Sequence, residues 1–421
     1  MTFMKRSGIR SRISAIDTNI YSMAKQTAKR ILPAYIAGFL AYAAIYIVRL
    51  NFSVASAAFE TSGVLTKAQI GVIGSIFSLT YAIAKVPGGY IGDACPSRTV
   101  ILAGLLIAAS TNFIIGLFPS FAVIAVLWGV NAFGQAMLWG PLLRSYRENC
   151  SEKAYLTISR TLGTSIPVGS IIGLCLSSWL VGRMDVSACF IVPALLVLLI
   201  AALARIFLFS APGHSNAKNG GFIGAFRAML TQKRFREIVF PAMAHGMIKD
   251  NITVWLALYF VDKYGVDVSK VAGYVFFIPL LTMLGKSSYL FLAKLLKDDY
   301  RISILSFAVC AVCALVLCVF DVPLFAAVLC FGLISALVAI INTHFLVAFP
   351  AEIATENTFS FAASIMDLLT YGGAGFGSLI FGVLITKFGF GSMFLVWSVF
   401  SVLSIAVLWH MKKTAAVAAY N

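Results

Sequence analysis

The sequence has 421 residues, of which 60% are hydrophobic and only 11% are charged, and its mean hydropathy is +0.94. Soluble chains usually carry about 25% charged residues, so this composition excludes a soluble globular protein and predicts a polytopic membrane protein. One span needs roughly 20 apolar residues, which leaves room for about a dozen helices joined by short loops. A sizeable aqueous catalytic domain is therefore excluded.

The net charge is +16, from 32 Lys and Arg against 16 Asp and Glu. In a soluble protein this excess would indicate nucleic-acid binding, but here the position of the charges favours the membrane surface, and we expect no nucleic-acid partner. Seven basic residues interrupt residues 1–30, so this segment is not a secretory signal peptide. Its apolar residues recur at helical spacing. This pattern suits a helix lying on an anionic inner leaflet, and a disordered basic tail is the alternative.

In chain order, hydropathy and helix breakers predict twelve spans. They are expected at 31–59, 69–92, 99–118, 120–143, 157–180, 186–209, 237–261, 270–296, 302–320, 322–348, 359–386 and 389–411. The longest polar stretch separates the sixth span from the seventh. We therefore expect a cytoplasmic basic segment at 1–30, a six-helix bundle at 31–210, a cytoplasmic loop at 211–236, a second six-helix bundle at 237–411 and a cytoplasmic tail at 412–421.

Basic residues fix the expected orientation, because Lys and Arg accumulate on the cytoplasmic side. With the N-terminus inside, 21 of the 32 basic residues fall in cytoplasmic segments and 5 in external loops. Both termini are therefore predicted to be cytoplasmic. One loop departs from the pattern, since the cytoplasmic segment 351–357 carries only Glu352 and Glu356.

The two halves of the chain resemble each other around their first helices. Residues 48–54 (VRLNFSV) match residues 248–254 (IKDNITV) at an offset of 200, which aligns Arg49 with Lys249 and Asn51 with Asn251. Lys85 and Lys286 follow at an offset of 201. Such a repeat predicts parallel halves related by an axis along the membrane normal, with the binding site where the halves meet.

Four cations lie deep in the predicted spans: Arg49, Lys85, Lys249 and Lys286. Each costs roughly 3 kcal/mol to insert, and the only acids at similar depth are Asp250 and Asp367. A surplus of about two positive charges suits a dianion such as a phosphoryl group, for which Arg offers a bidentate fork and Lys a point charge. The alternative is that these cations form structural bridges with the two acids and with backbone carbonyls.

Other polar and aromatic residues of the spans are candidates for the lining of the site. They are Tyr42, Tyr46, Tyr81, Asn51, Asn251, His245, Trp139 and His344. His245 is either a hydrogen-bonded packing residue or a group that titrates with the substrate's charge. His344 is equally open, and Trp139 is more typical of a packing aromatic than of a gate. Asp367, Asp250 or His245 could alternatively take up a coupling proton.

The sequence offers no sign of enzyme chemistry. The 8 cysteines have no ligating His spacing beside them and are read as small buried hydrophobes. No span carries a cluster of His, Asp and Glu or an activated nucleophile. We therefore expect neither an enzyme nor a metal or cofactor.

Several motifs carry a family resemblance. The segment 89–93 (GYIGD) with Arg98 resembles the loop motif between the second and third helices of the major facilitator superfamily. More narrowly, residues 41–52 (AYAAIYIVRLNF), 81–85 (YAIAK) and 371–375 (YGGAG) are similar to the first, second and eleventh helices of the organophosphate:phosphate antiporters, the group of glycerol-3-phosphate, hexose-phosphate and glucose-6-phosphate transporters.

The resemblance implies an all-α membrane fold of twelve helices in two pseudo-symmetric six-helix bundles. It also implies alternating access around a phosphate that one cation from each half holds. Arg49 falls on the family's first-helix arginine, whereas either His245 or Lys249 takes the place of the seventh-helix arginine, and the internal repeat favours Lys249. The fifth helix departs from the family, because its Trp-Asn and His-Asn pattern is missing around 161–169.

The predicted function is therefore secondary transport of a small organic anion, an organophosphate or phosphate-like solute, with exchange for inorganic phosphate left open. Two alternatives remain: a proton-coupled carboxylate or drug transporter of the same fold, and a non-transporting membrane receptor for a phosphorylated solute. The expected location is a bacterial inner membrane, the expected partners are the solute and the lipid bilayer, and the expected state is a monomer.

Overall fold

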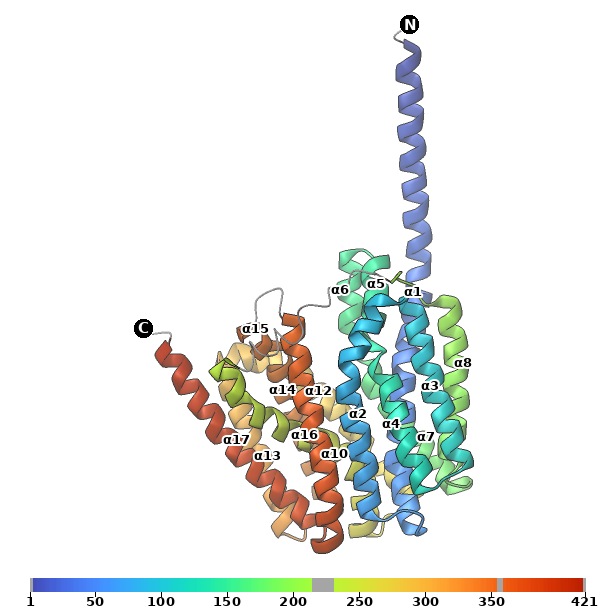
Figure 1. Cartoon of the computed structure of the whole chain (residues 1–421). Coiled ribbons are helices and arrows are strands. Elements are labelled where there is room, and N and C mark those ends of the chain that lie inside the picture. Colours follow the sequence, from blue (N-terminus) through green and yellow to red (C-terminus); the bar gives the residue numbers. More distant parts are fainter. Residues whose placement is uncertain (1–2, 214–230, 354–358, 419–421) are drawn as a thin grey trace.

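The computed structural model describes residues 3–213, 231–353 and 359–418, and in these ranges the chain is almost entirely helical (Figure 1). The elements of the first half are α1 (Phe3–Thr61), α2 (Lys67–Ala94), α3 (Ser97–Leu117), α4 (Phe121–Ala136), α5 (Trp139–Asn149), α6 (Glu152–Leu162), α7 (Ser165–Arg183) and α8 (Ala188–Phe207). Those of the second are α10 (Lys233–Tyr264), η1 (Val268–Lys270), α11 (Val271–Val275), α12 (Phe277–Leu296), α13 (Asp299–Val319), α14 (Leu324–Thr343), η2 (His344–Ala348), α15 (Phe349–Ile353), α16 (Phe359–Phe388) and α17 (Phe390–Ala418). The predicted all-α membrane fold is confirmed.

Every predicted span coincides with helix. Eleven helical segments of the described chain are long and apolar enough to cross a membrane. The remaining expected span, the seventh at 237–261, lies in α10, a helix of 32 residues whose middle carries Lys249 and Asp250. This polar centre lowers its hydropathy, and such a span is tolerated only where it faces protein or a wet cavity.

Several spans that the sequence predicts as single helices are broken in the structure. The span at 120–143 divides into α4 and α5 at Met137–Leu138, and the span at 157–180 divides into α6 and α7 at Gly163–Thr164. The tenth span widens into the π-helix η2. Broken and widened helices occur in membrane proteins where the backbone lines a cavity, and these breaks lie next to the central cavity of the protein.

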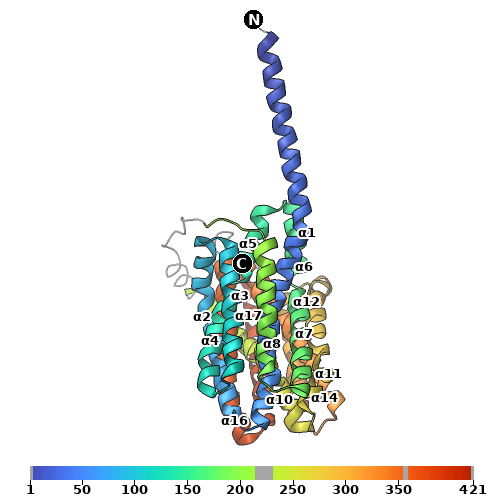
Figure 2. The same ribbon diagram turned by 90° about the vertical axis from the view of Figure 1, so that its right-hand side faces the viewer.

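The first and second halves of the chain lie side by side (Figures 1 and 2). Where they meet, α2 packs on α16, α1 on α10, and α7 on η1 and α12. An aromatic cluster around Tyr259, Phe331 and Trp397 fills the core of the second half. Both ends of the described chain lie on the same side of the bundle (Figure 1). The exact boundaries of the two bundles stay a prediction.

The N-terminal segment differs from the expected helix on the leaflet surface. Helix α1 runs without interruption from Phe3 into the first span, and its first turns project away from the bundle (Figures 1 and 2). Val48 is the one residue with non-helical φ and ψ inside α1, so the described backbone has no turn that would lay residues 3–30 flat. The predicted central loop at 211–236 falls mostly outside the described residues, and the tail continues α17 as far as Ala418.

The acidic loop that departed from the charge pattern has a basic partner. Glu352 forms an ion pair with Arg234 at the start of α10 and accepts a hydrogen bond from the Tyr300 hydroxyl (3.0 Å). At the same end of the bundle, Lys412 Nζ lies 2.8 Å from Asp298 Oδ2. Glu352 is therefore neutralised by a basic residue of α10. Glu356 lies outside the described residues.

Candidate functional site

A cavity of about 650 Å³ lies between the two halves of the chain. It takes its walls from α1, α2, α5, α6 and α7 of the first half and from α10, α12, α14, η2 and α16 of the second. Ten predicted site residues line it: Tyr42, Tyr46, Arg49, Tyr81, Lys85, Trp139, Lys249, Asp250, Lys286 and Asp367. All four predicted buried cations and both acids are among them. The cavity wall thus carries four cations and two carboxylates, which leaves two positive charges.

Arg49 is aimed into the cavity by a kink in α1. Val48 directly before it departs from helical geometry (φ −85°, ψ 16°), and Asn131 Nδ2 donates to the freed Val48 carbonyl (3.4 Å). The guanidinium then lies among aromatic faces, with Cζ 4.7 Å from the ring centre of Phe77 and 5.3 Å from that of Tyr81. Cation–π attraction holds the guanidinium there without using its N–H donors.

Arg49 and Lys249 share one carboxylate. Asp250 Oδ1 lies 3.6 Å from Arg49 Nη2, and Asp250 Oδ2 lies 3.5 Å from Lys249 Nζ. These separations are too long for good hydrogen bonds. Neither cation forms a hydrogen bond within the described ranges, although the Arg49 side chain is only 12% exposed. An oxyanion with several acceptor oxygens, such as a phosphoryl or a carboxylate group, could accept hydrogen bonds from both.

Lys85, one of the four predicted buried cations, is paired with an acid in the structure. Its Nζ lies 2.9 Å from Asp367 Oδ2 and 5.0 Å from the ring centre of Tyr81. This ion pair joins α2 to α16, hence one half of the chain to the other. Here the alternative interpretation, a structural bridge, describes the geometry.

Substitution of one partner of this bridge is expected to destabilise the protein more than removal of both. Lys85→Gln strands the Asp367 carboxylate, and Asp367→Asn strands the ammonium, whereas the double variant leaves no unpaired charge. We expect a coupling free energy on the order of 1 kcal/mol in a double-mutant cycle. Thermal unfolding of the purified variants in detergent measures it. Lys387→Gln, at the far end of α16, is the control, and additive effects of the two substitutions would contradict the bridge.

Lys286 is the cation without a partner. Among the residues that the structure describes, it forms no ion pair or hydrogen bond, and its side chain is exposed to the cavity. Of the two surplus charges, one therefore belongs to the group of Arg49, Lys249 and Asp250, and the other to Lys286.

Four predicted residues do not line the cavity, and the structure gives each another role. Asn51 Nδ2 donates to Asn112 Oδ1 (2.8 Å) and to the Cys189 carbonyl (3.0 Å), and Asn251 Nδ2 donates to the Ala374 carbonyl (3.1 Å). His245 Nε2 lies 2.9 Å from the Val338 carbonyl oxygen, and His344 Nδ1 lies 2.7 Å from Ser303 Oγ. All four side chains are buried. They are packing residues in this structure, which removes them as candidates for substrate contact.

Among the lining residues that the sequence did not predict, Tyr371 and Asn342 matter most for an anion. Tyr371 of α16 lies between the cations, since its ring centre is 4.8 Å from Lys249 Nζ and 5.8 Å from Arg49 Cζ. Asn342 of α14 has a buried Oδ1 without a hydrogen-bond partner. The four-residue spacing from Asp367 could have identified Tyr371, because residues i and i+4 share a helix face. Asn342 could have been identified because its amide side chain lies in an otherwise apolar span.

The bundle is closed at the end opposite the termini. There a Cβ added at Gly71 of α2 would lie 2.6 Å from the Ser378 carbonyl oxygen and 2.8 Å from Gly382 Cα of α16, so only glycine allows this approach. Beside it, Lys67 Nζ lies 3.0 Å from Asp262 Oδ2 of α10. Beyond Arg49 in this direction the space narrows to about 30 Å³. The cavity therefore occupies the half of the bundle nearer the termini.

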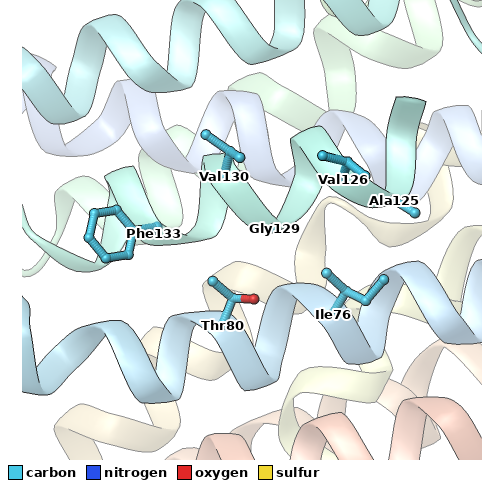
Figure 3. Close-up of a pocket in the computed structure, with 7 residues that line it drawn as sticks. All are labelled: Ile76, Thr80, Ala125, Val126, Gly129, Val130 and Phe133. Atoms are coloured by element: carbon cyan, nitrogen blue, oxygen red, sulfur yellow. The ribbon is translucent and has the colours of Figure 1, made fainter. Parts of the chain in front are cut away.

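A second hollow lies between α2 and α4 (Figure 3). Its walls are Ile76 and Thr80 from α2, and Ala125, Val126, Gly129, Val130 and Phe133 from α4. None of these side chains is charged, and Val126 is 66% exposed. Such a groove faces lipid in a membrane and offers nothing to an anion.

The family model of the Major Facilitator Superfamily matches residues 34–352, which is most of the chain. The chain belongs to the Major Facilitator Superfamily. Its two helical halves, which enclose a cavity, agree with this family. The fold is that of transporters rather than of enzymes.

By their names, the relatives of this chain include a membrane sensor and a transporter of a phosphate ester. The chain is 33% identical over 96 residues to the membrane sensor protein UhpC of Salmonella typhimurium, a match that covers 23% of the chain and 22% of the relative. It is 32% identical over 151 residues to the glycerol-3-phosphate transporter of Haemophilus influenzae, which covers 35% and 32%. These matches span at most about a third of either relative, and they agree with the predicted resemblance to the organophosphate:phosphate antiporters.

The fold also has a solved counterpart. The crystal structure of a bacterial homologue of the human lysosomal transporter Spinster, in an inward-facing unoccupied conformation, superposes with a TM-score of 0.77. The match covers 91% of this superfamily member and 97% of the homologue at 15% identity, which supports the fold alone.

Proposed function

We propose that the chain is a secondary transporter of a small organic anion, a phosphate ester, and that Arg49 and Lys249 hold its phosphoryl group. One observation carries the proposal: these two cations, one from each half of the chain, line one cavity without any hydrogen bond to a described residue. Phosphoryl oxygens would supply the missing acceptors. The sequence match to the glycerol-3-phosphate transporter supports the same substrate class.

Alternating access explains why the cations come from both halves. An anion that bridges Arg49 and Lys249 draws the two halves together, and the closed end at Gly71 and Gly382 would open as the other end closes. With the orientation that the basic residues predict, both termini are cytoplasmic and the described state is closed to the outside. We further propose a bacterial inner-membrane location and a monomer.

Counterflow tests this function. Full-length protein is reconstituted into proteoliposomes loaded with inorganic phosphate, and uptake of radiolabelled glycerol 3-phosphate or glucose 6-phosphate is measured. Uptake that depends on internal phosphate supports the proposal. Uptake that does not depend on internal phosphate and is abolished by a protonophore would instead support a proton-coupled carrier, with Asp367 or Asp250 as the coupling group.

A receptor is the second candidate, and the match to UhpC favours it. Both functions use the same cavity, but only a transporter releases the bound solute on the opposite side of the membrane. A receptor would show a ligand-dependent rise in Tm, because the ligand binds only the folded state. It would show no counterflow with any loaded anion.

A further inference from the structure

This inference deepens the proposed function and rests on it: it concerns what else the solute carries besides its phosphoryl group. The relevant residue is Lys286 of α12. Its neighbour Gly285 brings α12 against α14, since a Cβ there would lie 2.2 Å from the Ala336 carbonyl oxygen. Across this contact, Ser335 and Asn342 of α14 line the same cavity as Lys286.

The internal repeat shows why Lys286 lacks a carboxylate. Lys85 is its counterpart at an offset of 201, and Lys85 is neutralised by Asp367. The same offset leads from Asp367 to Ile166, which also lines the cavity, so the position that would neutralise Lys286 is apolar. The two halves therefore differ at this position: Lys85 has an acidic partner, and Lys286 does not.

The two surplus charges of the cavity consequently belong to two different groups of side chains. Arg49 and Lys249 share Asp250, which leaves one positive charge at the junction of α1 and α10. Lys85 and Asp367 cancel. The second positive charge is on Lys286, and an ammonium inside a membrane protein is costly unless something neutralises it.

We propose that Lys286 is a second anion-recognition residue, so that the transported solute carries two separate anionic groups. The phosphoryl group lies on Arg49 and Lys249, and a carboxylate or second phosphoryl group lies on Lys286. Asn342, whose Oδ1 has no partner, stands on the same wall and can orient a hydroxyl of the solute.

Two probes that differ at one group test this assignment: 3-phosphoglycerate and glycerol 3-phosphate share a phosphorylated three-carbon skeleton, but the first ends in a carboxylate and the second in a hydroxymethyl group. Binding to the purified full-length chain is measured by isothermal titration calorimetry. We expect the wild-type chain to bind 3-phosphoglycerate at least about tenfold more tightly, as a charge-assisted hydrogen bond would give. Lys286→Gln should remove that preference, because it should weaken the binding of 3-phosphoglycerate at least about tenfold and that of glycerol 3-phosphate by much less.

Lys286→Arg keeps the charge and should keep most of the preference. Lys294→Gln, an exposed lysine farther along α12, is the matched control and should change neither affinity. If Lys286→Gln weakens both probes equally, or if the wild-type chain does not distinguish them, the second site is wrong while the proposed function stands. If neither probe nor inorganic phosphate binds the wild-type chain, the proposed function itself fails.

Discussion

Replacement of Arg49 or Lys249 by Gln is expected to reduce phosphate-ester counterflow at least about 100-fold, because each removes one of the two charged contacts that the anion makes with opposite halves of the protein. Arg49→Gln removes the bidentate fork and leaves Asp250 to neutralise Lys249, so this group of side chains no longer has a surplus positive charge. Lys249→Gln leaves the anion attached to the first half alone. Arg49→Lys should recover only part of the rate, since Lys is a point charge that cannot bind bidentately.

The measurement is the initial rate of counterflow per reconstituted protein, with expression and Tm recorded for each variant. Arg183→Gln is the control for loss of an arginine: this side chain stacks on Trp179 near the end of α7, outside the cavity. Wild-type counterflow in both Arg49→Gln and Lys249→Gln would remove the basis for an anion site at this position.

The sequence predicts the charged residues of the site well because a charged residue is easily recognised within an apolar span. An ionised side chain at depth in a membrane is so costly that it faces a cavity or a partner. Arg49, Lys249, Lys85 and Lys286 all line the cavity for this reason. Their pairings could not be predicted, because the bridge from Lys85 to Asp367 depends on how α2 meets α16.

Neutral polar residues were harder to place, since each can be satisfied locally at little cost. His245 lies one turn from Lys249 on α10, yet α14 crosses α10 at this level and its Val338 carbonyl binds the ring. Asn51 and Asn251 recur in the repeat because both tie helices together through backbone carbonyls. A recurring residue can thus reflect the fold as well as the site.

The helix breaks were likewise beyond the sequence. The spans at 120–143 and 157–180 contain the helix breakers Gly140–Pro141 and Gly163, but the sequence alone does not decide whether a membrane helix continues through them or ends there. These breaks bring Trp139 and Gly163 to the cavity wall. At such breaks tertiary packing overrides the helix propensity of the sequence, because neighbouring helices form hydrogen bonds with the backbone groups that the break exposes.

Gly71→Val is expected to keep the closed end of the bundle open and to abolish transport. The valine side chain has no room against the Ser378 carbonyl and Gly382, and overpacking of this kind costs about 1–3 kcal/mol. Because the open conformation relieves the clash, this cost shifts the population toward it by about 5- to 150-fold. A carrier that cannot close one end cannot complete its transport cycle. The rate of counterflow should therefore fall as the population of the closed conformation falls.

Labelling of Thr253→Cys reports the shift, because Thr253 lines both the main cavity and the narrow space beyond Arg49. A membrane-impermeant maleimide applied from the Lys67 side should react little in the Gly71 background and strongly with Gly71→Val, with the reactivity of the chain without the added cysteine subtracted. Gly382→Val clashes from the opposite helix and should give the same result. Gly140→Val is the control, because a Cβ at Gly140 meets no atom within 4 Å. Unchanged labelling and full counterflow in both clashing variants would show that α2 and α16 do not form the gate.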